Sequence, residues 1–276
     1  MIKKHFIACS GMLVLMVLAK LFIFSTPSDR QKSPFKFGDS PQKDSSTDSF
    51  IASMSFANET MPSQDPNVVK RIRKELKAYS HNTMQTSKLH QNAKRWFPIV
   101  ESMLKAYGIP DDFKYIPLVE SGFESGTSSY RGASGYWQFM PGTARTYGLR
   151  VDKNVDERQD IRRSTIAACK YLKSLYMEFN DWTLVAAAYN IGETNLKRQM
   201  IRQRQDNYFK MKLNRETGSY VYKLISMKEI IENPVQHGYA KPIEARRFIN
   251  SDFKHLYEIL PLADKPAVVK PYIFYN

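Results

Sequence analysis

The chain has 276 residues, of which 42% are hydrophobic, so it can bury a core as one large domain or two small ones. Its 41 Lys and Arg against 27 Asp and Glu give a net charge of +14, which implies a polyanionic partner such as nucleic acid, anionic lipid or cell-wall polymer. No helix-turn-helix, zinc-ligand or aromatic RNA-binding signature accompanies this charge, which argues against nucleic acid. The two cysteines, Cys9 and Cys169, lie in an apolar run and a predicted helix, so we expect no disulfide between them.

The first 25 residues resemble an export signal. Lys3 and Lys4 precede a nearly continuous apolar run over residues 7–19. A cleavable signal peptide and an uncleaved membrane anchor both fit residues 1–25, although the run is short for a full membrane span. In either case, we expect most of the chain to lie in the cell envelope or periplasm. Residues 26–66 are rich in Ser, Pro, Asp, Gln and Lys, a composition that predicts a disordered linker.

From residue 67 onward the apolar spacing predicts helices and no confident strand, which indicates an all-α fold. The sequence predicts a basic amphipathic helix over 67–78 and a longer helix over 88–107. Residues 67–95 are expected to form an N-terminal helical extension. The next helix opens at Pro110, is expected to kink or start late at Pro117, and ends at Gly122. Further helices are predicted over 141–147, from the capping Asp160 to about 179, from the capping Asp181 to Gly192, and over 217–232, before Pro234.

Glu120 ends an apolar helix, where burial would raise the pKa of its carboxyl group and suit it to general acid–base chemistry. The alternative is a surface carboxylate at a helix end. Glycosidases commonly need a second carboxylate, and the candidates are Glu124, Asp111, Asp112, Asp152, Asp156 and Glu157. Each of these has a simpler role in a loop or at a helix start. Because none of these carboxylates is a strong candidate for a second catalytic group, the sequence favours a mechanism in which the substrate supplies that group.

Two further segments carry residues suited to a carbohydrate groove. Residues 137–140 read Trp, Gln, Phe and Met. The rings of Trp137 and Phe139 could stack on sugars or could simply belong to the core. Residues 189–192 read Tyr, Asn, Ile and Gly, which could face the same groove or merely finish a helix. The basic run over 197–215 could be a solvated face or could attract anionic polymers.

Between Trp96 and Pro234 the order of these motifs resembles family 1 lytic transglycosylases, which are lysozyme-like enzymes that cleave peptidoglycan. The segments that carry the resemblance are 96–101, 115–123, 135–141, 143–149, 156–158, 187–192 and 216–224. The sequence departs from the family pattern at 124–127, where Glu-Ser-Gly-Thr replaces a usual Asn-Pro-Asn-Ala, and at Tyr136 and Ile191.

The resemblance implies an all-α, lysozyme-like catalytic domain over 96–235, followed by a C-terminal tail at 236–276. Glu120 would be the single acid/base, first protonating the oxygen between N-acetylmuramic acid and N-acetylglucosamine. It would then deprotonate the muramyl 6-hydroxyl to form a 1,6-anhydro end. Substrate-binding positions carried over from the family are Ser121, Gln138, Met140, Tyr189, Asn190 and Tyr220.

The resemblance implies peptidoglycan strands as the partner, with no metal and no cofactor, and it predicts nothing about oligomeric state. Two alternatives remain open. One is a hydrolytic muramidase on the same fold. The other is a catalytically silent peptidoglycan-binding envelope protein, which the altered loop at Glu124 would favour.

Overall fold

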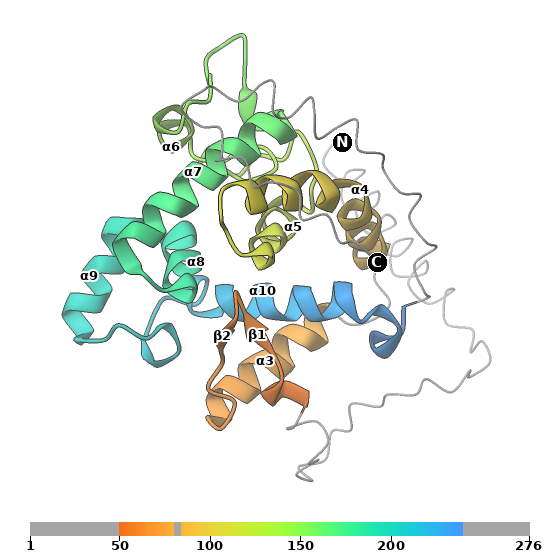
Figure 1. The fold of residues 1–276 in the computed structure, drawn as a ribbon, viewed down its shortest axis with the longest axis vertical. Helices are drawn as coiled ribbons and strands as arrows, with labels where there is room; N and C mark the ends of the chain where they lie inside the picture. Colours follow the sequence, from red (N-terminus) through yellow and green to blue (C-terminus); the bar gives the residue numbers. More distant parts are fainter. Residues whose placement is uncertain (1–49, 80–83, 240–276) are drawn as a thin grey trace, which may run out of the picture. The chain divides into compact units, whose positions relative to one another are not determined.

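The computed structural model describes residues 50–79 and 84–239, which are mainly helical, with one very small sheet (Figure 1). This confirms the all-α prediction. The expected signal or anchor at 1–25, the linker up to residue 49 and the tail from residue 240 lie outside the described residues. Within the described ranges, no helix is both long and apolar enough to span a membrane.

The segment before the first long helix is folded. Strands β1 (Ser55–Phe56) and β2 (Glu59–Thr60) pair antiparallel through a turn in which Ala57 and Asn58 have positive φ. Ile51 and Phe56 are fully buried, and Glu59 accepts hydrogen bonds from the first backbone N–H groups of a distant helix. The predicted disorder is therefore wrong for residues 50–65, because a few apolar side chains in a polar stretch suffice to dock it on the core.

Helix α3 (Pro66–Tyr79) follows, and its buried stripe of Val68, Ile72 and Leu76 repeats every four residues as predicted. It packs along α10 (Thr217–Glu232). Helix α4 (Met84–Ala106) packs against α7 (Ile161–Phe179) and the short 3₁₀ helix η1 (Asp111–Lys114).

Helix α5 (Tyr115–Ser121) begins one residue after η1, so Pro117 produces a late start rather than a kink. Pro117 lies in the first turn, where its missing N–H would have no helical partner. Gly122 ends the helix in the left-handed region at φ 63°, and its N–H donates to the Leu118 carbonyl, as the sequence predicted. The buried residues of α5 fix its last turn against the core.

The remaining elements follow the predicted order. Asp160 and Asp181 cap α7 and α8 (Trp182–Ile191) by accepting backbone N–H bonds in the first turn. Cys169 is buried in α7, and burial raises the pKa of its thiol. The other elements are α6 (Pro141–Thr146), η2 (Glu157–Gln159), α9 (Glu193–Gln203), η3 (Tyr208–Lys210) and η4 (Pro234–His237).

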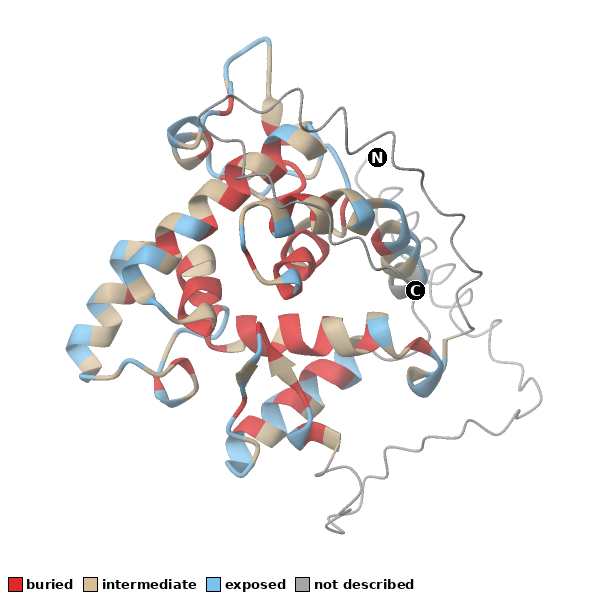
Figure 2. Ribbon diagram, viewed as in Figure 1, coloured by how far each residue is buried: buried red, intermediate tan, exposed pale blue. Residues whose placement is uncertain are grey.

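Helix α8 is the centre of the packing that forms the site. Its Ala186, Ala187 and Ala188 are fully buried, and the small side chains allow close contact with both α7 and α10. Figure 2 shows buried residues concentrated on α5, α8 and α10. These three helices therefore supply a rigid support for the polar residues at their ends.

Candidate active site

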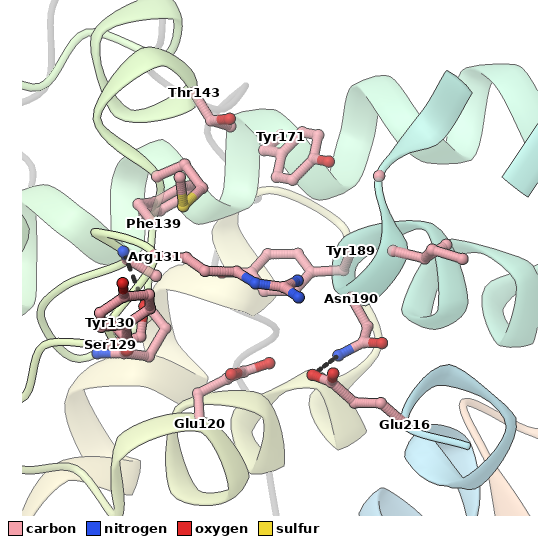
Figure 3. A pocket seen from close by; sticks show the side chains of 15 residues that line it. Glu120, Ser129, Tyr130, Arg131, Phe139, Thr143, Tyr171, Tyr189, Asn190 and Glu216 are labelled. Atoms are coloured by element: carbon pink, nitrogen blue, oxygen red, sulfur yellow. Dashed lines mark hydrogen bonds between the residues drawn. The ribbon is translucent and has the colours of Figure 1, made fainter. Parts of the chain in front are cut away.

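The carboxyl group of Glu120 lies at the end of α5 and borders a cavity of about 620 Å³ (Figure 3). The lining comes from α5, from α6 and the loop before it, from α7 and α8, and from the residue that caps α10. It comprises Glu120, Ser129, Tyr130, Arg131, Ala133, Gln138, Phe139, Met140, Thr143, Tyr171, Tyr189, Asn190, Ile191, Gly192 and Glu216. A volume of this size is typical of a site for a small ligand or part of a polymer.

The surroundings of Glu120 favour its protonated form. Burial raises the pKa of its carboxyl group above the ordinary value, and the nearby charge of Glu216 raises the pKa further. Tyr220 opposes this effect, because its hydroxyl donates a hydrogen bond to Oε1 of Glu120 at 2.5 Å, and Lys223 adds a weaker lowering of the pKa. In the described part of the chain Oε2 has no hydrogen-bond partner. Glu120 can therefore carry a proton on the oxygen that faces the cavity.

Tyr189 and Tyr220 remain hydrogen-bond donors across the neutral pH range. Burial raises the pKa of each phenol well above its ordinary value, and the negative charge of Glu120 raises both further. The Tyr220 hydroxyl donates to Glu120, whereas the Tyr189 hydroxyl donates to the backbone oxygen of Trp137 at 2.7 Å. Tyr220 thus touches the acid, and Tyr189 ties α8 to the loop before α6.

Aromatic rings form one wall of the cavity. Tyr171 packs 5.5 Å from Tyr189 and 6.2 Å from Phe139, measured between ring centroids. Such faces stack on the apolar faces of sugar rings. Trp137, for which sugar stacking was one reading, belongs to the core instead: it is fully buried, and its indole N–H donates to Thr165.

Gln138 lines the cavity with an unusual backbone, at φ 48°. A non-glycine residue in this region costs about 1 kcal/mol, which the fold offsets by two hydrogen bonds from its Nε2 to the backbone oxygens of Thr127 and Gly135. These bonds leave the amide oxygen as the group available to a ligand. Met140, which also lines the cavity, is 44% exposed.

Asn190 is fixed from α10. Its Oδ1 accepts a hydrogen bond from the Thr217 hydroxyl at 2.8 Å, and its Nδ2 lies 3.4 Å from Oε1 of Glu216. Figure 3 shows the carboxyl group of Glu120 directed toward this Asn190–Glu216 pair. The end of α8 and the start of α10 therefore form the wall opposite α5.

Ser121 occupies a different position from the other predicted residues. Its hydroxyl donates to the backbone oxygens of Pro117 and Tyr136, and it lines a smaller cavity of about 320 Å³. Glu120 also borders this second cavity, so the acid lies between two hollows. Glu124, in the segment that departs from the family pattern, pairs with Lys88 at 2.6 Å on the rim of the smaller one.

None of the carboxylates proposed as a second catalytic group lines the larger cavity. Asp111 pairs with Lys114, Asp112 with Lys228, Asp152 with Arg150, Asp156 with Arg158, and Glu157 with Arg163. Glu216, which the motif at 216–224 contained but which was not predicted as a site residue, is the second carboxylate there. Four other lining residues were also not predicted from the sequence: Ser129, Tyr130, Arg131 and Tyr171. The only signal for the first three was that they lie in a Gly/Ser-rich loop at 124–135.

The loop that carries Arg131 is held by a buried arginine. The guanidinium of Arg158 donates to the backbone oxygens of Gly132 and Phe139, at 2.8 Å and 2.9 Å, and pairs with Asp156 through two nitrogens. Ser128 and Ser134 pair across the base of the same loop. Ser129, Tyr130 and Arg131 are therefore held at the edge of the cavity by an anchored loop, with the Tyr130 side chain fully exposed.

Comparison with known proteins finds similarity over the segments that build this site. Residues 98–212 match the family model described as "Transglycosylase SLT domain". This part of the chain is therefore similar to the transglycosylase SLT domain. Membrane-bound lytic murein transglycosylase D of Escherichia coli (strain K12) is 29% identical over 205 residues, which are 72% of this chain and 45% of that protein. A putative tributyltin chloride resistance protein of Alteromonas sp. (strain M-1) is 32% identical over 130 residues, 46% of this chain and 63% of its own length.

The chain thus spans less than half the length of the Escherichia coli relative that it matches. The transglycosylase SLT match contains Glu120, Gln138, Tyr189 and Asn190, but it ends before Tyr220. The expected domain boundaries at 96 and 235 stay a prediction. Among the described residues, no group of His, Cys, Asp and Glu is arranged to hold a metal ion.

Proposed function

We propose that this protein is an envelope enzyme that cleaves peptidoglycan by lytic transglycosylation, with Glu120 as its single general acid and base. The observation that carries the proposal is the position of Glu120. Its carboxyl group has a raised pKa, one oxygen held by Tyr220 and the other open to an aromatic-lined cavity. The family resemblance supports the substrate, β-1,4-linked N-acetylmuramic acid and N-acetylglucosamine.

In the first step the protonated Glu120 donates its proton to the glycosidic oxygen as the bond from the muramyl C1 breaks. The raised pKa keeps this proton on the carboxyl group to a higher pH than an ordinary glutamic acid would hold it. The carboxylate that forms is stabilised by the hydrogen bond from Tyr220. The partly exposed rings of Tyr171 and Tyr189 in the cavity wall offer faces on which the sugar rings stack.

In the second step the Glu120 carboxylate takes the proton from the 6-hydroxyl of the same muramyl unit. The freed oxygen attacks C1 and closes a 1,6-anhydro ring, so no water is consumed. The proton taken up by Glu120 restores the starting acid. This sequence needs one carboxyl group, because the substrate supplies its own nucleophile.

A hydrolytic muramidase is the second candidate, and Glu216 is the observation that favours it. Its carboxylate lies in the same cavity and is placed by Asn190, so it could activate a water molecule. Against this role, the Glu216 side chain is exposed to solvent. Product mass separates the two reactions: anhydro ends are lighter by one water than hydrolysed ends.

The test is mass analysis of the muropeptides that the purified protein releases from isolated sacculi. We expect 1,6-anhydro ends, and reducing ends would select the muramidase. Glu120→Gln should lower the rate of release by about 10²–10⁴-fold while binding to the sacculi persists, since general acid–base catalysis contributes this much. Glu216→Gln is the matched control, and it should retain anhydro products. If no product appears with the wild-type protein, the protein is a silent peptidoglycan binder.

A further inference from the structure

A third concave surface lies between α3 and the segment formed by η3 and the residues that follow it. We call it the basic hollow. It has a volume of about 560 Å³, and its lining consists of Asp65, Asn67, Val68, Lys70, Arg71, Lys74, Phe209, Lys210, Met211, Lys212 and Tyr222. None of these residues borders the cavities around Glu120. The basic hollow is therefore a separate site.

Four lysines surround the hollow in two pairs. Lys70 and Lys74 lie one turn apart on α3, and Lys210 and Lys212 flank the buried Met211, whose extended backbone directs its two neighbours away from the core. All four are exposed, and none has an ion pair or side-chain hydrogen bond within the described part of the chain. The fold thus gathers positive charge from segments about 140 residues apart.

The hollow has little negative charge of its own to balance these lysines. Asp65 is its one carboxylate, and an oxygen of Asp65 accepts the backbone N–H of Asn67. Lys197, from the same basic run as Lys210 and Lys212, instead pairs with Glu178 and Glu193. With Arg71, five like charges surround one hollow and repel one another, and a bound polyanion would relieve that repulsion.

The type of charged group and the other lining residues limit the chemical class of ligand that the basic hollow can bind. Lysine ammonium groups bind phosphate as point charges, whereas planar carboxylate recognition is the strength of arginine. Arg71 already donates to the Gly218 carbonyl at 2.8 Å and lies over the Tyr222 ring, so it is held in place. Beside the lysines, the half-buried ring of Phe209 adds an aromatic surface of the kind on which a sugar ring packs.

We propose that the basic hollow binds a phosphorylated saccharide, with phosphates held by the two lysine pairs and the sugar ring against Phe209. The hollow would attach the protein to a phosphate-bearing polymer at a point distinct from the cavity of Glu120. This assignment does not depend on the proposed reaction at Glu120.

The experiment measures binding of glucose 1,6-bisphosphate to the full chain by amide chemical shifts and by calorimetry, at low and high salt. The test variant carries Lys70→Gln, Lys74→Gln and Lys212→Gln. The matched control carries Lys105→Gln, Lys153→Gln and Lys173→Gln, three exposed lysines outside the hollow that lower the net charge equally. We expect the test variant to weaken binding at least tenfold and the control less than twofold, with shifts at Phe209 and Met211.

Three comparisons decide the assignment. Equal weakening in both triple variants would show attraction by net charge alone and would overturn the site. Pyrophosphate binding as tightly as glucose 1,6-bisphosphate would overturn the saccharide. Phosphatidylglycerol vesicles that bind through the same lysines, in the absence of sugar-phosphate binding, would replace the saccharide with a lipid surface. Unchanged thermal unfolding of the test variant confirms that these exposed substitutions leave the fold intact.

Discussion

Tyr220→Phe tests the electrostatic control of Glu120. The substitution removes the hydroxyl that lies 2.5 Å from Oε1 of Glu120 and keeps the ring, which is 3% exposed. A hydrogen bond to a charged group is worth about 1.5–3 kcal/mol. Since this bond stabilises the carboxylate and so lowers its pKa, its removal raises the pKa of Glu120 further. At about 1.4 kcal/mol per factor of ten, the protonated form gains roughly ten- to a hundredfold.

Two changes in kinetics should follow from Tyr220→Phe. The alkaline limb of the kcat/KM profile, which reports loss of the proton from the free acid, should move to higher pH. At neutral pH kcat should fall, because the carboxylate formed in the first step loses a stabilising donor. The assay is release of muropeptides from sacculi over a range of pH, with the wild-type protein measured alongside.

Tyr115→Phe is the matched control for Tyr220→Phe. Its hydroxyl donates to Glu232 at 2.8 Å, so the change again deletes a buried tyrosine–carboxylate bond, but one outside both cavities that Glu120 borders. The control should leave the pH profile unchanged. An alkaline limb that stays in place or moves to lower pH in Tyr220→Phe, or an equal shift in Tyr115→Phe, would refute the reasoning.

Three further outcomes follow from the structure. Because burial raises the pKa of Glu120 above 4.5, the native state holds this proton more tightly than the unfolded chain, and its contribution to stability declines as pH rises from 4.5 through the raised pKa. Glu120→Gln should therefore be more stable than the wild type at pH 7 and not at pH 4, with a slope of at most about 1.4 kcal/mol per pH unit in urea unfolding. In Gly135→Ala the new Cβ would lie 1.9 Å from the Arg158 carbonyl oxygen, and we expect a loss of about 3 kcal/mol or more. Gly126→Ala, at a similar φ of +77° in open space, should lose only about 1–2 kcal/mol by the same measurement. Among the described residues, Arg131 is the only basic side chain that lines the larger cavity, so Arg131→Gln should raise KM several-fold for peptide-bearing glycan and leave peptide-stripped glycan unaffected.

The helices that build the site could be predicted because local and tertiary preferences agree in them. Asp160 and Asp181 each supply a cap directly before an apolar repeat, and the structure has both caps. Gly122 supplies the left-handed residue that ends α5, which places Glu120 in the last turn of that helix. Helix α9 was not predicted, because its basic residues obscure a single buried position at Leu196.

Other site features depend on contacts that no local pattern contains. Tyr171 has the spacing of a core residue, and only the packing of α7 beside α8 turns it toward the cavity. Glu216 joins the site because α10 begins next to the end of α8, where Asn190 meets it. The role of Trp137 was ambiguous for a similar reason, since an indole can stack on a sugar or fill a core, and the bond to Thr165 decides for the core.

The packing also shows that the site extends beyond the matched domain. The transglycosylase SLT match ends at residue 212, yet the residue that holds the Glu120 carboxyl group is Tyr220 on α10. Helix α10 is in turn supported by α3 and β1, which precede the match, and Arg71 of α3 bonds to the Gly218 carbonyl two residues before Tyr220. We therefore expect the hairpin and α3 to influence Glu120 through α10, because they support the helix whose Tyr220 hydroxyl bonds to the Glu120 carboxyl group and affects its pKa.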